Sequence, residues 1–221
     1  AVAAIIQHNT SGIISLKDSG ITSPKGMEGH SYATWDMPIE QAIIKKVVTD
    51  DGGDYSKINL ISTSVEDIKA ALSSNIDSVW IYYAWDGIAC ELQGLDTNFF
   101  YFKDYSPELD DYSPVIIANN NFLKNNSEVA KKFMAALSKG YDYAIENPDD
   151  AAQILVDANE GLDIELCKKS QNWLASQYKA DADKWGVIDQ KRWDAFYGWV
   201  YDNGLCEIDI PDGFGFSNDD L

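Results

Sequence analysis

The pattern of apolar and polar positions predicts a chain in which strands and helices alternate first and helices dominate later. Residues 77–92 give the clearest signal, because β-branched and aromatic residues fill positions 79–83 and apolar residues resume at helical spacing from Ile88. Such a near-continuous apolar run suits a strand covered on both faces in an α/β sheet. Open α/β sheets bind ligands beyond the carboxyl ends of their strands. The sequence therefore predicts a ligand edge at Trp85 and Asp86.

Further strands and helices are expected on both sides of this segment. The expected strands are residues 1–7, 31–35, 58–61, 99–102 and 115–118. Asp36 is the expected N-cap of a helix over residues 37–48, because it precedes Pro38 and an apolar face. Ser64 and Asp67 resemble a capping box that opens a short helix. Residues 8–12 are polar and turn-prone, and we interpret them as a crossover between two parts of the fold.

The second half of the chain is expected to be almost entirely helical. Four helix starts are expected, at Asn126, Asn147, Asp163 and Asp189. In the last helix, the apolar residues share one face at helical spacing, which favours core packing over a ligand-facing stripe; they are Trp193, Phe196, Tyr197 and Val200. We expect two lobes joined by a hinge, with residues 1–7 and 108–221 in one lobe and residues 8–107 in the other.

Composition narrows the possible functions of this globular chain. The 221 residues are 45% hydrophobic, which is enough to bury a core. Seventeen basic and 36 acidic residues give a net charge of -19, which disfavours nucleic acid as a partner. Three separated cysteines and two histidines predict neither a metal site nor a disulfide framework, and nothing indicates a cofactor. No apolar run reaches the roughly 20 residues of a membrane helix.

Several segments in a shared order resemble the solute-binding proteins of ABC transporters, in the family that carries thiamine pyrimidine precursors. The segments are residues 5–12, 29–40, 80–91, 140–141, 146–148, 185–189, 192–199 and 213–221. The resemblance implies a type II periplasmic-binding-protein-like fold of two α/β lobes. It also implies an extracytoplasmic location, in the periplasm or lipid-anchored to the outer face of the cell membrane, and an ABC permease as partner.

The resemblance also implies that the amino-terminal strands and helices of the first lobe are absent from this chain. The remaining helices of that lobe would then expose apolar faces. We therefore expect a homodimer or a domain swap to cover them.

A pyrimidine precursor is flat, so its cleft needs an aromatic platform and a few oriented hydrogen-bonding groups. Trp35 and Trp85 fit the first need, because both fall at expected strand-to-helix turns. Asp86 and Glu40 are candidate acceptors for an amine. Thr34 and the amide groups after residue 36 are candidates to hold a polar or anionic substituent.

Each candidate also has a purely structural interpretation. Both tryptophans are alternatively core aromatics, and Asp86 is alternatively only a helix cap. In the crossover, the side chains either contact the ligand or simply fix the hinge; these residues are His8, Asn9 and Thr10. Tyr82 and Tyr83 must point to opposite faces of their strand, so at most one reaches the edge.

Three functions follow from this reading. The leading one is a binding protein with no chemistry of its own. The second is a protein of the same fold that binds another solute, such as a sulfonate, a nitrate-like anion or a flavin precursor. The two tryptophans, Trp35 and Trp85, favour a flat ring over a small oxyanion. The third is an enzyme resembling the thiamine-pyrimidine synthases, which use a histidine and a cysteine-rich segment. This chain has no such segment, because Cys90, Cys167 and Cys206 each stand alone.

Overall fold

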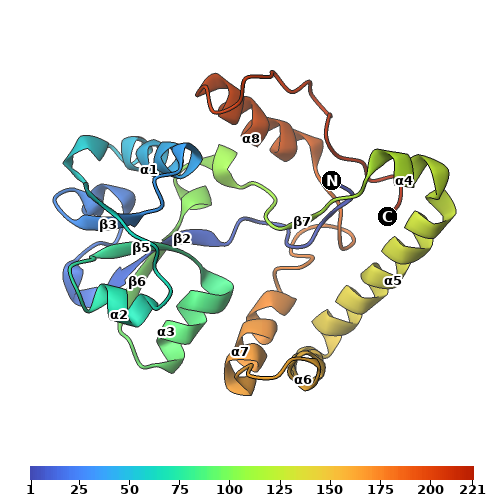
Figure 1. The fold of residues 1–221 in the computed structure, drawn as a ribbon, viewed down its shortest axis with the longest axis horizontal. Coiled ribbons are helices and arrows are strands. Elements are labelled where there is room, and N and C mark those ends of the chain that lie inside the picture. The colour runs from blue at the N-terminus through green and yellow to red at the C-terminus, as the bar shows by residue number, and fades with distance from the viewer. The chain divides into compact units, whose positions relative to one another are not determined.

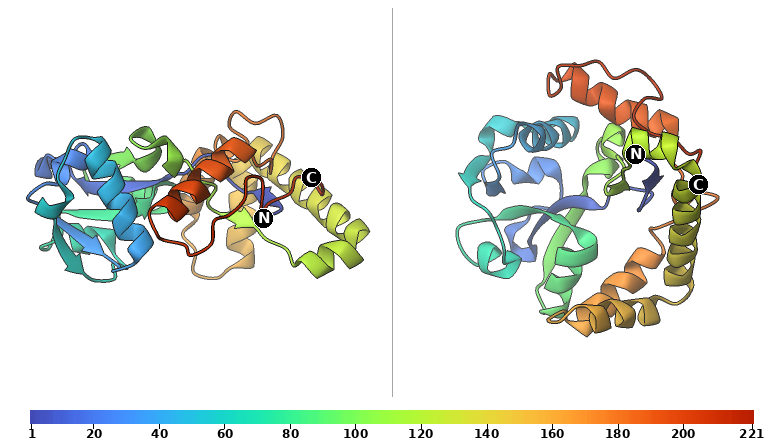
Figure 2. Two further views of the ribbon diagram at one scale, coloured as in Figure 1. Left: turned by 90° about the horizontal axis from the view of Figure 1, so that it is seen from above. Right: turned by 45° about the vertical axis from the view of Figure 1, so that its right-hand side comes forward.

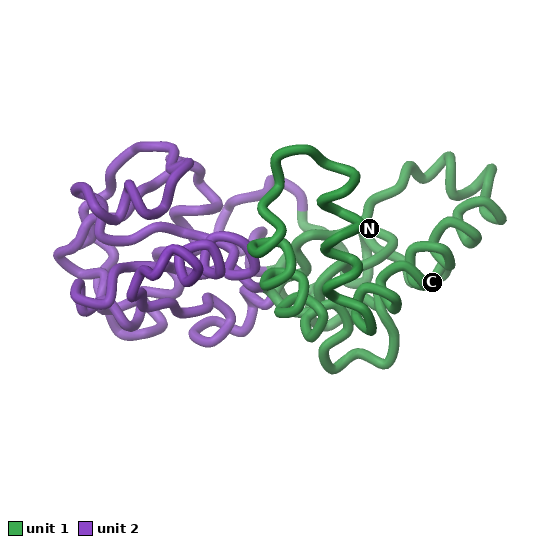
Figure 3. The backbone as a smooth tube through the Cα atoms, turned by 90° about the horizontal axis from the view of Figure 1, so that it is seen from below, with its two compact units in different colours: residues 1–9, 111–198, 209–221 green, residues 10–110, 199–208 purple.

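The computed structural model describes residues 1–221 and divides into two compact units (Figure 3). Unit 1 comprises Ala1–Asn9, Asp111–Gly198 and Asp209–Leu221, and unit 2 comprises Thr10–Asp110 and Trp199–Ile208. The expected lobe limits, 1–7 with 108–221 and 8–107, differ from these chiefly at 199–208. The end of the last helix and the turn after it belong to unit 2.

Unit 2 is built on a five-stranded mixed sheet in the order β4-β3-β5-β2-β6. The strands are β2 (Ser11–Leu16), β3 (Ser31–Thr34), β4 (Asn59–Ser62), β5 (Ser78–Tyr82) and β6 (Thr97–Tyr101). β3 pairs in parallel with β4 and β5, whereas β2 pairs antiparallel with β5 and β6. The expected α/β class is confirmed. The interpretation of residues 8–12 as a crossover is wrong at its end, because Ser11 and Gly12 already belong to a strand between two others.

Helices cover both faces of this sheet (Figures 1 and 2). One face carries α1 (Pro38–Asp50), and the other carries α2 (Ile68–Leu72) and α3 (Ile88–Leu92). Alternate residues of β5 serve opposite faces, so Val79 and Ile81 join the core beneath α2 and α3 while Trp80 points to the other side. The predicted strand and helix within residues 77–92 are therefore confirmed.

Two expected helix caps are wrong. Asp36 has a left-handed backbone with φ of 58°, and Met37 is the N-cap of α1. The Asp36 side chain instead accepts a hydrogen bond from the Ser62 hydroxyl. α2 begins after Asp67, whose carboxylate accepts the Ala70 amide at 2.9 Å, so Ser64 is not its cap. In both places the helix begins later in the chain than the candidate capping residues predict.

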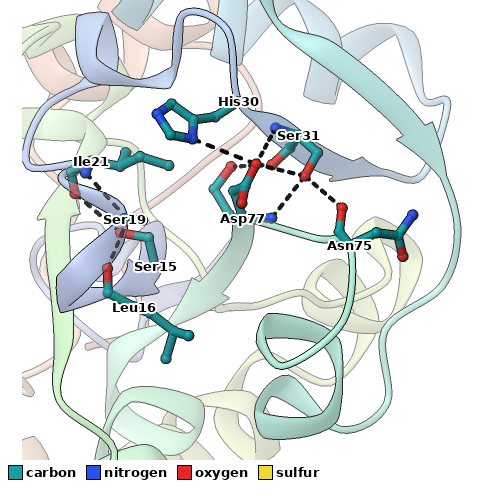
Figure 4. Close-up of polar contacts among 9 residues, drawn as sticks. Ser15, Leu16, Ser19, Ile21, His30, Ser31, Asn75 and Asp77 are labelled. Atoms are coloured by element: carbon teal, nitrogen blue, oxygen red, sulfur yellow. Dashed lines mark hydrogen bonds and ion pairs between the residues drawn. The ribbon is translucent and has the colours of Figure 1, made fainter.

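The edge of the sheet where β3 and β5 begin is tied together by hydrogen bonds (Figure 4). One Asp77 carboxylate oxygen accepts from the Ser31 amide at 2.7 Å and the Ser31 hydroxyl at 2.9 Å, and it lies 3.5 Å from His30 Nδ1. The Ser31 hydroxyl also donates to the Asn75 carbonyl. These bonds help to hold the pKa of Asp77 below its usual range against the opposing effect of burial, which is the largest contribution.

Unit 1 contains a small antiparallel pair and most of the helices. Its elements are β1 (Ala3–Ala4), β7 (Val115–Ile116), α4 (Asn120–Asn125), α5 (Ser127–Glu146), α6 (Pro148–Ala158) and α7 (Ile164–Ala175). α8 (Gln190–Asp202) begins in unit 1 and ends in unit 2. The four expected helices are present, whereas α4 was not predicted and the first strand is much shorter than residues 1–7.

The core of unit 1 is centred on Trp185, which is 1% exposed. Its indole stacks on Tyr141 with ring centroids 4.2 Å apart, and its N–H donates to the Ile5 carbonyl at 3.1 Å. Trp193 is also buried, as the helical spacing predicts. None of the helices in this chain combines the length and the apolar character that a bilayer crossing requires.

Candidate ligand-binding site

Three strands of unit 2 bring candidate residues to one edge of the sheet. The carboxyl ends of β3 and β5 are neighbours, and β2 starts beside them because Ser11 pairs with Tyr82. The Tyr83 amide also donates to the Thr10 carbonyl at 3.1 Å. This edge, called the ligand edge below, therefore carries Thr10, Trp35 and the turn that contains Trp85.

Trp35 is a supported but solvent-accessible aromatic surface. Its side chain is 45% exposed, and its ring lies against Trp80 with centroids 5.4 Å apart and planes tilted by 37°. Trp80 in turn meets the ring of Phe102 edge to face at 4.5 Å. Because Trp80, which itself packs on Phe102, supports one side of Trp35, the exposed part of the Trp35 indole is available for stacking.

Glu40 organises the turn that holds Trp35. The Glu40 side chain is 1% exposed and accepts hydrogen bonds from the Tyr32 hydroxyl at 2.5 Å and the Thr34 hydroxyl at 2.9 Å. It also accepts the amides of Trp35 at 3.0 Å and Met37 at 3.4 Å. Burial and the bond to Glu40 raise the pKa of Tyr32. Glu40 thus fixes the path of the chain from β3 into α1.

The same network changes what this turn can bind. The Asp36 amide donates to the Thr34 hydroxyl at 3.0 Å, and the amides on either side donate to Glu40. Thr34 itself is 1% exposed. Among the amides after residue 36, which were expected to hold a polar or anionic substituent, that of Met37 already donates to Glu40. The Asp36 amide before it donates to Thr34, so fewer N–H groups are left for such a substituent.

Trp85 and Asp86 lie in a single π-helical turn, Tyr83–Gly87, that leads from β5 into α3. Trp85 is 43% exposed, while Asp86 is partly buried. Burial raises the pKa of Asp86, against the lowering effect of backbone hydrogen bonds. The N-cap of α3 is Gly87, without a side-chain bond, so Asp86 is not the cap that the alternative interpretation required.

The structure decides which tyrosine reaches the ligand edge. Tyr82 is 42% exposed and alternates onto the same face as Trp80. Tyr83 instead packs against Phe99, with ring centroids 5.1 Å apart, and its hydroxyl donates to Glu91. Sequence reasoning left this choice open, because strand alternation shows that the two differ but not which face is buried.

His8 and Asn9 belong to unit 1 and are not part of the group in unit 2. His8 Nε2 lies 3.1 Å from a carboxylate oxygen of Asp181, and the Asn9 amide donates to Asp111 at 2.6 Å. Beside them is a polar pocket of about 650 Å³. Its lining includes Gln7, Tyr112, Asp181, Asp183, Lys184, Asp189 and Arg192.

This unit 1 pocket was not predicted from the sequence. The Arg192 guanidinium lies 5.0 Å from the centre of the Tyr112 ring, and the Tyr112 hydroxyl accepts the Asp189 amide at 2.9 Å. The sequence offered only the adjacent Arg192 and Trp193 as a signal, without showing that Tyr112 approaches them. No group of three or more His, Cys, Asp and Glu side chains is placed to hold a metal ion.

Comparisons with known proteins find a family model and a relative that match most of this chain. A family model described as NMT1/THI5 like matches residues 1–151. A formylaminopyrimidine-binding protein from Halalkalibacterium halodurans is 26% identical over 206 residues, which are 90% of this chain and 62% of the relative. This chain therefore spans about three fifths of the length of that relative.

Two solved structures share the fold. The periplasmic sulfonate-binding protein of an ABC transporter from Methylobacillus flagellatus has a TM-score of 0.66 at 16% identity, covering 98% of this chain and 65% of its own. The desulfurization enzyme DSZB has a TM-score of 0.59 at 10% identity, covering 96% of this chain and 74% of its own. At such identities the likeness shows the type II binding-protein-like fold, which is compatible with different functions.

Proposed function

We propose, because this chain belongs to the NMT1/THI5-like family, that it is a solute-binding component of an ABC importer. Its ligand is a thiamine pyrimidine precursor or a related flat heterocycle, bound at the ligand edge of unit 2. The relative from Halalkalibacterium halodurans, named for binding a formylaminopyrimidine, supports this ligand class. The importer's permease is the proposed partner, and the proposed location is outside the cytoplasm.

The exposed indole of Trp35, supported from behind by Trp80, is the observation that carries the proposal. An aromatic surface of this kind suits the face of a heterocyclic ring. Trp85 and Tyr82 add two further exposed rings at the same edge. Asp86 offers carboxyl oxygens that accept hydrogen bonds from an exocyclic amine. The proposed role of Glu40 and Thr34 is to position Trp35 by fixing the turn that carries it.

A sulfonate or another small anion fits this edge less well. The amides of the turn after β3, which would otherwise attract an anion, donate to Glu40 and Thr34. The chain as a whole carries a net charge of -19, which repels anions over longer distances. The ligand edge therefore favours a neutral or cationic ring.

Binding without a chemical step is supported by the environment of the possible nucleophiles. Burial raises the pKa of Cys90 to about 11 and also raises the pKa of Cys167, which disfavours the reactive thiolate. His30 lies beside Asp77, and the Ser31 hydroxyl donates to Asp77 and to the Asn75 carbonyl rather than to His30. A nucleophile and a base in direct contact, as covalent catalysis requires, are thus not formed by Ser31 and His30.

Replacing Trp35 with alanine should weaken binding of a formylaminopyrimidine by about 10- to 100-fold, the usual loss when a central aromatic contact is truncated. Isothermal titration calorimetry measures the effect. Phe214 is 65% exposed and lies in unit 1, so Phe214→Ala is a matched control that should bind like the unchanged chain. Equal affinities for both variants would contradict the role given to Trp35.

The ligand class is tested by thermal shift with a panel of compounds. Hydroxymethyl, aminomethyl and formylamino pyrimidines should raise the melting temperature, because a ligand that binds only the folded state stabilises it. Thiamine tests tolerance of a larger substituent, and alkanesulfonates test the anion alternative. Stabilisation by alkanesulfonates with no response to any aminopyrimidine would refute the ligand assignment and leave the fold unaffected.

A further inference from the structure

The function proposed for unit 2 leaves the polar pocket of unit 1 without a role. This pocket of about 650 Å³ is formed by Gln7, Tyr112 and residues 181–192, and all of its lining residues belong to unit 1. Its volume falls in the range of pockets that hold small molecules, about 300–1,000 Å³. The hydrogen-bonding groups and the charges of the lining therefore determine what it can bind.

Gln7 provides a buried hydrogen-bond acceptor that the chain leaves without a donor. The Gln7 side chain is 2% exposed and lines the pocket. Its orientation is fixed, because Nε2 donates to the Val187 carbonyl at 2.9 Å. No group of the chain donates to Oε1 of the same side chain. A buried amide oxygen without a donor is costly, so this part of the pocket favours a molecule that supplies an N–H or O–H group.

The two basic residues of the lining are held by acceptors within the chain. Arg192 donates to the main-chain carbonyl of Gln7, and its guanidinium lies 5.0 Å from the centre of the Tyr112 ring. Lys184 Nζ donates to the Leu221 carbonyl at 3.3 Å. An anion entering the pocket would have to compete with these contacts. The positive charges of the lining are therefore poorly placed to bind an anionic ligand.

The three acidic residues of the lining give the pocket an excess of negative charge. Asp181 lies 3.1 Å from His8 Nε2, and Asp189 accepts the Arg192 amide at 2.9 Å. Asp183 is exposed and forms neither a hydrogen bond nor an ion pair within the chain. Because no set of three acidic, histidine or cysteine side chains is placed to hold a metal ion, the lining favours an organic cation.

We propose that the unit 1 pocket binds a small aliphatic amine in its ammonium form. An ammonium group carries three N–H donors and no acceptor, so it can donate to Gln7 Oε1 and is attracted by the carboxylate of Asp183. The net charge of -19 adds a long-range attraction for cations. A diamine suits the pocket best, because one end bonds to the buried amide oxygen while the other stays beside the exposed carboxylate. This site is separate from the ligand edge and does not depend on the function proposed for unit 2.

Calorimetric titration of putrescine, a four-carbon diamine, tests the site in about 0.15 M NaCl, which screens exposed charges. We expect saturable binding at one site per chain and no binding of the diol of the same length. Asp183→Asn should weaken the affinity about tenfold, the usual effect of removing a charged hydrogen-bond partner. Gln7→Met removes the amide oxygen at similar size and should also weaken binding. Thermal melting shows whether that variant is folded.

Two controls separate this site from net charge and from the ligand edge. Glu160 is exposed in unit 1 and does not line the pocket, so Glu160→Gln should leave putrescine affinity unchanged. Excess formylaminopyrimidine should not displace putrescine, and competition between them would instead place the amine at the ligand edge and overturn the proposal. The absence of saturable putrescine binding would overturn it too. Equal affinities of Asp183→Asn and Glu160→Gln, or unchanged affinity in folded Gln7→Met, would do the same.

Discussion

Replacing Glu40 with alanine is expected to lower the free energy of unfolding of unit 2 by about 3 kcal/mol, because each buried donor that is left without an acceptor costs about 1–3 kcal/mol. The side chain is 1% exposed and accepts hydrogen bonds from two hydroxyls and two amides. Alanine leaves all four donors without this acceptor. Because Tyr32 and Thr34 are also buried, water cannot readily replace it. Urea denaturation followed by circular dichroism measures the change.

Two further variants show whether the network causes this loss. Glu40→Gln keeps one acceptor oxygen, so its destabilisation should be smaller than that of Glu40→Ala. Glu66 is exposed, and Glu66→Ala should change the unfolding free energy by less than about 0.5 kcal/mol. If Glu40→Ala is as stable as Glu66→Ala, the network does not hold the turn of Trp35.

Replacing Gly12 with alanine is expected to destabilise unit 2 by about 3 kcal/mol or more, at or above the upper end of the usual effect of overpacking. A Cβ atom at this position would lie 2.0 Å from the Phe100 carbonyl oxygen and 2.8 Å from the Phe99 ring. The ring can rotate, but the carbonyl belongs to the paired strand β6 and cannot move alone. The sheet must therefore separate locally. Thermal and urea unfolding report the loss.

Gly140 provides the matched control for this substitution. A Cβ atom there meets nothing within 4 Å, and the residue lies inside α5. Gly140→Ala should therefore stabilise the chain by up to about 1 kcal/mol, because alanine favours helix more than glycine does. An unfolding midpoint for Gly12→Ala equal to that of the unchanged chain would show that β2 and β6 are less closely packed than the structure indicates.

The sequence predicted those parts of the fold whose apolar pattern is unambiguous. Residues 79–83 are apolar almost without interruption, and they form the predicted strand before α3. β2 was missed because Thr10, Ser11 and Ser15 are polar yet buried. The backbone bonds of β2 to strands on both sides stabilise it there, and such pairing partners far along the chain are not visible in a local pattern.

The ligand edge could be located from the sequence, but the exposure of its residues could not. Strand ends placed Trp35 and Trp85 at turns, and both prove to be exposed. Glu40 was expected to accept a hydrogen bond from a ligand amine, because nothing local shows that Tyr32 and Thr34 enclose it. His8 was grouped with them because it lies in the expected crossover, although it belongs to unit 1.

Calorimetric titration of a formylaminopyrimidine into the unchanged chain and into Trp35→Ala measures whether the ligand binds at Trp35. We predict saturable binding at one site per chain, greatly weakened in Trp35→Ala, and no heat from an alkanesulfonate under the same conditions. Tight binding of the alkanesulfonate without binding of the pyrimidine, or pyrimidine binding that is indifferent to Trp35, would contradict the ligand edge described here.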